Sequence, residues 1–151
     1  MENEIITLKD GKTVRLSDLF IECNNIYFNC GLERPFLFTF IGRRECSMAN
    51  CKRNRKGRII SRFIGIACNI DWSEENLRRV LLREMACLKA MSCANHSIRK
   101  YGKEFKALTE ELNSKYGLCL SAEEYRFDFC YKPKPCNPLR YIFNFIKRSR
   151  K

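Results

Sequence analysis

The chain is 151 residues long, 45% hydrophobic and 12% aromatic, and it carries a formal net charge of +12 at pH 7. This length fits one domain with a buried core, and the apolar content excludes an intrinsically disordered chain. No run approaches the roughly 20 apolar residues that a transmembrane helix needs, and the acidic residues 1–4 lack the basic start of a signal peptide. We therefore expect a soluble, cytoplasmic protein and no membrane partner.

The first expected elements are a β-hairpin and a helix. Two short β-rich runs within residues 5–15 flank Asp10-Gly11, a pair typical of hairpin turns. Ser17 then fits the N-cap of a helix, because apolar residues recur after it at helical spacing. Gly31 is expected to end this helix, since glycine readily takes the left-handed conformation.

A sheet and two helices are predicted next. Residues 36–70 contain two aromatic or β-branched runs separated by a basic run, which predicts three antiparallel strands with the basic cluster at one hairpin. Ser73, followed by two acidic residues, fits the start of a helix that breaks near residues 92–95. The last of these helices is expected from about residue 97 to residue 116, with Gly117 ending it.

Positive charge is concentrated in two segments. Residues 43–62 hold eight Lys and Arg against one acid, residues 132–151 hold seven and no acid, and each segment therefore has a net charge of +7. Such clusters favour a polyanionic partner, although a solvated loop and a solvated tail are the alternative. We expect the first segment to bind nucleic-acid phosphates with little sequence preference, and Phe40 and Phe63 are candidates for stacking on bases. The residues assigned to this contact are Arg43, Arg44, Lys52, Arg53, Arg55, Lys56 and Arg58.

The C-terminal segment is predicted to contain a basic amphipathic helix. Pro138 suits the first helical position, apolar residues recur between 139 and 146, and five residues with four positive charges follow. One interpretation is a helix that docks on the domain, and the other is a helix that binds an anionic membrane or a partner.

Ten cysteines and one histidine are the candidate sulfur and nitrogen ligands for a zinc ion. Cys46, Cys51, Cys130 and Cys136 together offer a candidate structural zinc site, although their spacings are loose and no CxxC motif occurs. Several other cysteines lie in apolar patterns and are interpreted as buried free thiols. His96 falls in the predicted helix break and is interpreted as a solvated loop residue.

Two motifs give a family resemblance. The run LLREMAC at 81–87 is similar to the LLHEMxH of the SprT-like family of zinc metalloproteases, and YGKEFKAL at 101–108 is similar to its HGxxFxxL. The resemblance covers about two thirds of the chain. It implies an α+β zincin fold with an N-terminal helix, a three-stranded antiparallel sheet and two motif-bearing helices at 17–120. An N-terminal hairpin (1–16) and the basic extension (121–151) would flank this domain.

The chain departs from the family at each zinc ligand. Zinc is held there by three histidines, and the glutamate after the first accepts a proton from zinc-bound water. Here the three positions hold Arg83, Cys87 and Tyr101. A guanidinium cannot ligate, tyrosine is a poor ligand, and one thiolate does not hold zinc alone. Glu84 keeps the general-base position, where an ion pair with Arg83 is expected, and no cofactor is expected.

The resemblance and the basic segments together imply a catalytically inactive pseudo-metalloprotease that binds DNA or a DNA-associated protein. Two alternatives stay open. One is a zinc-dependent metallopeptidase that acts on DNA-bound proteins, and the other is a membrane-surface or partner-binding adaptor that uses the C-terminal helix. The sequence specifies neither the partner nor the oligomeric state.

Overall fold

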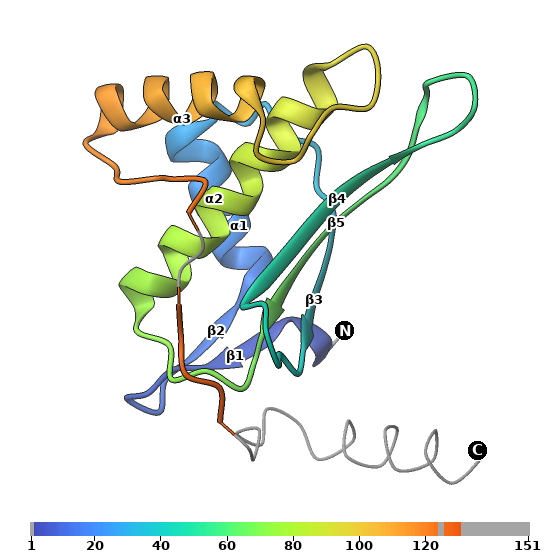
Figure 1. The fold of residues 1–151 in the computed structure, drawn as a ribbon. Coiled ribbons are helices and arrows are strands. Elements are labelled where there is room, and N and C mark those ends of the chain that lie inside the picture. Colours follow the sequence, from blue (N-terminus) through green and yellow to red (C-terminus); the bar gives the residue numbers. More distant parts are fainter. Residues whose placement is uncertain (1, 124–125, 131–151) are drawn as a thin grey trace, which may run out of the picture.

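Three helices and two small sheets give the described chain an α+β architecture, as predicted (Figure 1). The computed structural model describes residues 2–123 and 126–130, so the predicted C-terminal helix lies outside the described residues. In chain order the elements are η1 (Glu2–Glu4), β1 (Ile5–Thr7), β2 (Thr13–Arg15), α1 (Leu16–Tyr27), β3 (Phe36–Phe40), β4 (Ser47–Arg53), β5 (Ile59–Ala67), α2 (Glu74–Cys93) and α3 (Lys103–Tyr116). In this part of the chain, no helix combines the length and the apolar character needed to cross a membrane.

The N-terminal hairpin forms as predicted. Strands β1 and β2 pair antiparallel, and Gly11 takes a φ of 89° in the turn between them, a conformation that favours glycine. Ile6 and Leu8 are buried in the same core as the helices, and the Lys9 N–H donates to the carbonyl of Trp72. The hairpin is therefore tied to the rest of the fold.

Helix α1 begins and ends differently from the prediction. Arg15 occupies the N-cap, and Ser17 lies buried in the first turn without capping it. Beyond the helix, Asn29 and Cys30 take the left-handed conformation, so Gly31 is not the residue that ends α1. The physical reason is Asn24, whose side chain exchanges two hydrogen bonds with the backbone of Leu32 and fixes the path of this loop.

The prediction of three antiparallel strands is wrong for β3. The strand order is β3-β5-β4, in which β4 pairs antiparallel with β5 but β3 pairs parallel with it. The loop 41–46 therefore crosses the end of β5 and does not form a hairpin. Asn69 holds this crossing, because its side chain accepts from the N–H of Gly42 at 2.7 Å and donates to the carbonyl of Gly42 at 2.8 Å. A side chain distant in sequence thus decides the strand direction.

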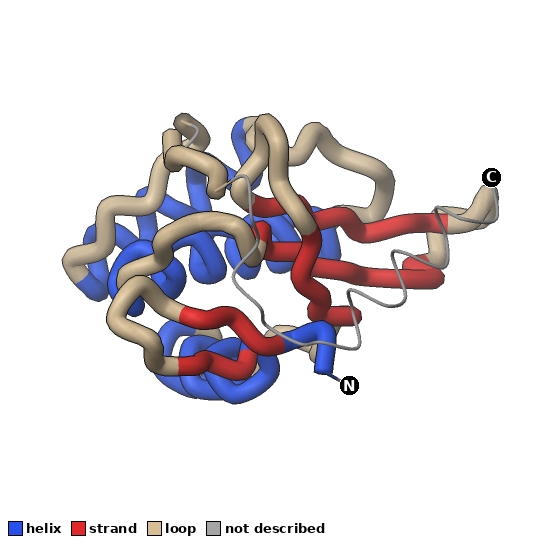
Figure 2. Tube along the Cα trace, turned by 90° about the horizontal axis from the view of Figure 1, so that it is seen from below, coloured by secondary structure: helices blue, strands red, loops and turns tan. Residues whose placement is uncertain are grey.

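The two faces of this sheet differ. Leu37, Thr39, Ala49, Ile64 and Ile66 are buried on the inner face, where the helices lie (Figures 1 and 2). Along β3 and β4 these buried positions alternate with residues that are exposed or half-buried, as expected for strands covered on one side.

Three of the four ends of helices α2 and α3 lie close to the positions that the sequence predicts. The Ser73 hydroxyl accepts from the Asn76 N–H, which confirms the predicted cap, and Gly117 ends α3 with a φ of 66°. Helix α3, however, starts at Lys103 and not near residue 97. Residues 94–102 form a loop instead, and His96 is exposed in it, as predicted.

Candidate functional site

The motif positions 83, 84, 87 and 101 come together in one buried cluster. Helix α2 carries Arg83, Glu84 and Cys87, and the loop before α3 carries Tyr101. The Tyr101 hydroxyl donates to Oε1 of Glu84 at 3.2 Å, and the Arg83 guanidinium lies 4.4 Å from the centroid of the Tyr101 ring. The fold therefore brings the two motifs against each other.

The carboxylate of Glu84 is the centre of this cluster and is fully buried, with an exposed fraction of 0%. Its Oε1 accepts a hydrogen bond from the Ser47 hydroxyl on β4 at 2.6 Å as well as the one from Tyr101. Its Oε2 lies 3.4 Å from the Lys100 ammonium but accepts no hydrogen bond from the described residues. We interpret the Lys100 contact as an attraction between charges, because the hydrogen-bond geometry is not met.

The ion pair between Arg83 and Glu84 is longer than expected. The closest approach of the two charges is 4.0 Å, from Nη1 to Oε1. The guanidinium instead donates to two backbone carbonyls, those of Ser121 at 3.1 Å and Ala122 at 3.0 Å. Arg83 therefore compensates the carboxylate at the limit of ion-pair distance while it fastens the segment 118–123 over α2.

Sequence reasoning missed two members of the cluster, Ser47 and Lys100. Ser47 begins β4, 37 residues before Glu84, and no motif marks it. Lys100 directly precedes Tyr101, and this adjacency is the one sequence signal that could have identified it as a member of the cluster. Both Arg83 and Lys100 are near the carboxylate, so the cluster holds two positive charges and one negative charge.

The thiol of Cys87 and the phenol of Tyr101 are held in their protonated forms. Burial, followed by the charge of Glu84, raises the pKa of each group well above its ordinary range. Neither side chain thus supplies an anionic nucleophile at neutral pH.

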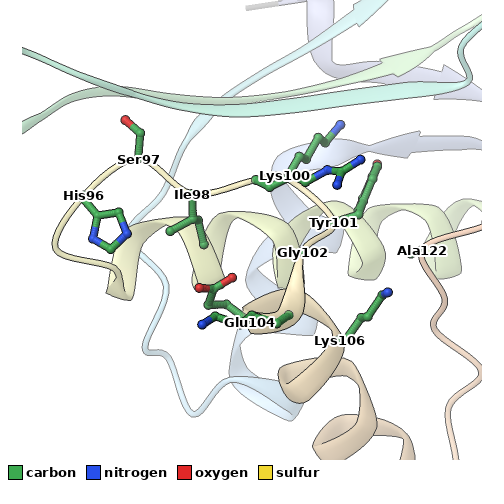
Figure 3. A pocket seen from close by; sticks show the side chains of 11 residues that line it. His96, Ser97, Ile98, Lys100, Tyr101, Gly102, Glu104, Lys106 and Ala122 are labelled. Carbon is green, nitrogen blue, oxygen red and sulfur yellow. The ribbon is translucent and has the colours of Figure 1, made fainter.

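A surface depression of about 760 Å³ lies beside the cluster and is shown in Figure 3. Its lining comes from residues 96–104, Lys106 and Ala122. Lys100 and Tyr101 line the depression and also contact Glu84. These two side chains project from the loop on the same side in Figure 3.

The described residues contain no group of three His, Cys, Asp or Glu side chains that would hold a metal ion. For the predicted cysteine site, Cys46 precedes β4 and Cys51 lies within it. At about 3.3 Å a residue, five steps along a strand separate them by about 16 Å, too far for one zinc ion to bind both. Cys130 lies beside Asn69, and Cys136 is outside the described residues.

The predicted nucleic-acid contact is divided between two ends of the sheet. Lys52, Arg55, Lys56 and Arg58 are exposed at the β4–β5 hairpin. Residues 43 and 44 are also exposed, but they lie in the loop at the opposite end of β4.

Arg53 is committed to the fold. Its guanidinium donates to the carbonyls of Gly57 at 2.7 Å, Met91 at 2.8 Å and Ala94 at 2.5 Å. It therefore ties the hairpin to the end of α2 and is not directed at a ligand.

The fold and the site define an α+β protein with a sealed carboxylate cluster and a basic hairpin. No protein-family model matches the chain, and no curated protein matches it either.

Proposed function

We propose that this protein is a catalytically inactive relative of the SprT-like metalloproteases that binds nucleic acid, or a protein bound to nucleic acid, through the β4–β5 hairpin. The main support for catalytic inactivity is that Glu84 is enclosed. A general base must reach the water or the substrate from which it takes a proton. Glu84 is fully buried and is contacted by Lys100, Tyr101 and Ser47.

The cations in the cluster argue against a metal at this position. Arg83 and Lys100 already supply two positive charges near one carboxylate, and a divalent cation would add repulsion at close range. Tyrosine is a poor zinc ligand, and Cys87 would supply only one thiolate. The positions that hold zinc in the family are therefore suited here to keeping two motifs packed together.

The hairpin supports the binding half of the proposal. It extends beyond the helices in Figure 1. Its turn is fixed because Oδ1 of Asn54 accepts from the N–H groups of Lys56 and Arg58, and Gly57 takes a φ of 78°. A preorganised turn loses little backbone entropy when its cations bind phosphates. Phosphate contacts of this kind carry no sequence information.

A salt titration tests the binding. Replacing Arg55, Lys56 and Arg58 with alanine should flatten the slope of log affinity against log salt by about 2 to 3, at roughly 0.7 to 0.9 per lost phosphate contact. The control variant replaces Lys9, Lys12 and Arg15 with alanine. It removes the same charge from three exposed residues of the N-terminal hairpin and should leave the slope unchanged. If the salt slope flattened equally in both variants, the effect would come from net charge and not from the hairpin. Normal binding by the hairpin variant, together with loss of binding on deletion of residues 131–151, would place the contact on the tail and contradict the proposal.

Metal content and proteolysis test the other half. Purified protein should hold no stoichiometric zinc by elemental mass spectrometry and should show no zinc-dependent cleavage of a casein or histone substrate. Zinc near one ion per chain that disappears in a Cys87→Ala variant would support the metallopeptidase alternative and overturn the inactive assignment.

A further inference from the structure

The outer face of the three-stranded sheet is unusually aromatic. Phe36, Phe38 and Phe40 occupy alternate positions of β3, and therefore share one face. Phe63 of β5 pairs with Phe36 and joins the same face. Leu37 and Thr39 between them are buried on the side of the helices. The side of the sheet that faces away from the helices thus displays phenylalanine where polar residues are the rule.

The four rings form a continuous row, in which Phe36 is exposed and Phe38, Phe40 and Phe63 are half-buried. Ring centroids lie 5.7 Å apart for Phe36 and Phe38, 6.3 Å for Phe38 and Phe40, and 5.9 Å for Phe38 and Phe63. Gly65 makes this arrangement possible, because a Cβ there would lie 2.6 Å from Cζ of Phe38. The ring of Phe38 therefore lies directly over the β5 backbone, and Phe36 is left 68% exposed at one end of the row.

Positive charge continues this surface in one direction. Lys52 pairs with Ser61, two residues before Phe63 on β5, and both are exposed. The cations of the β4–β5 hairpin follow directly beyond them. On the same face, Asn50 pairs with Phe63 and Met48 with Gly65. An apolar partner alone would gain nothing from this adjacency, whereas an aromatic and anionic ligand would match both parts.

We propose that this outer face binds unpaired nucleobases by stacking, so that the preferred ligand is a single-stranded nucleic acid with its phosphates toward Lys52 and the hairpin. The inference deepens the proposed function and rests on nucleic-acid binding by the hairpin. Four residue steps separate Phe36 from Phe40, about 13 Å along the strand, which is room for two or three bases. Phenylalanine rings accept any base, so the preference is for strandedness and not for sequence.

Binding to two probes tests the inference with the full chain. The probes are an oligo(dT) strand of about 15 nucleotides and the matching dA·dT duplex, a length within the range that one such domain would cover. A Phe36→Ala variant should bind the single strand at least about fivefold more weakly and bind the duplex as the unaltered protein does. The matched control is Ile21→Ala, because Ile21 is a 48% exposed apolar residue on α1, and this variant should bind both probes normally.

A Phe36→Trp variant supplies a direct readout. It should keep the affinity for oligo(dT), and its added fluorescence should be quenched on binding. The native Trp72 is fully buried and should contribute little to this quenching.

The outcomes separate the inference from the proposed function. Normal single-strand binding by Phe36→Ala, with salt slopes still dependent on the hairpin, would overturn the stacking surface and leave hairpin binding intact. Failure of the unaltered protein to bind either probe would overturn both.

Two further outcomes would assign the aromatic face to another occupant and would also overturn the inference. One is fluorescence of the Phe36→Trp variant that shifts to the red only when residues 131–151 are deleted, which would identify the chain's own C-terminal segment. The other is a dimer that dissociates in Phe36→Ala, which would identify a second copy.

Discussion

Replacement of Arg83 with methionine is expected to lower the free energy of unfolding by about 4 kcal/mol. Removing one partner of a buried ion pair costs about 3 to 5 kcal/mol, because the remaining charge stays desolvated. Lys100 still compensates Glu84 at 3.4 Å, which reduces the cost. The loss of the hydrogen bonds to the carbonyls of Ser121 and Ala122 increases it. Methionine keeps most of the volume, so a cavity contributes little.

Urea unfolding measures this change, with the midpoint and the slope both recorded. The matched control is Arg79→Met on the same helix, whose ion pair with Glu75 is exposed and should contribute less than about 1 kcal/mol. Adding Glu84→Gln to Arg83→Met should recover at least about 1 kcal/mol of coupling, because the two residues interact directly. A cost for Arg83→Met no larger than that of the control, with an unchanged slope and no coupling, would refute the view that the guanidinium compensates the buried carboxylate.

Three other expectations follow from the structure. Placing histidine at positions 83, 87 and 101 together should give one zinc ion per chain by elemental mass spectrometry, and a folded triple variant without zinc would show that the pocket lacks the geometry of the SprT-like zinc site. Burial raises the pKa of the Cys23 thiol from 9.0 to about 11, so the folded chain keeps a proton that the unfolded chain releases. Stability should be complete below pH 9.0 and fall by up to about 3 kcal/mol towards pH 11, as measured by urea unfolding across this range, and Cys23→Ala should reduce the fall. Arg53→Ala should lower the unfolding free energy by about 2 kcal/mol in the same assay, because its guanidinium binds three carbonyls, whereas Arg55→Ala should leave it unchanged.

Local signals in the sequence determined most of the elements. Asp10-Gly11, Ser73 and Gly117 each act within a few residues of themselves, and the turn, the cap and the helix end that they predict are present. The alternation of buried and open positions in β3 also follows from a period-two pattern. The motif spacing placed Arg83, Glu84 and Cys87 on one helix, because i and i+4 share a face.

Only the tertiary structure decided the direction of β3, the environment of Glu84 and the separation of the basic residues. Asn69 holds the loop after β3 across the end of β5. No local sequence signal near residues 41–46 predicts this contact. Ser47 and Lys100 reach Glu84 from β4 and from the loop before α3. The sequence places Arg53 among other cations, yet the fold commits it to carbonyls at the end of α2. Each of these outcomes depends on contacts between residues far apart along the chain, which composition and periodicity do not encode because both describe only sequence neighbours.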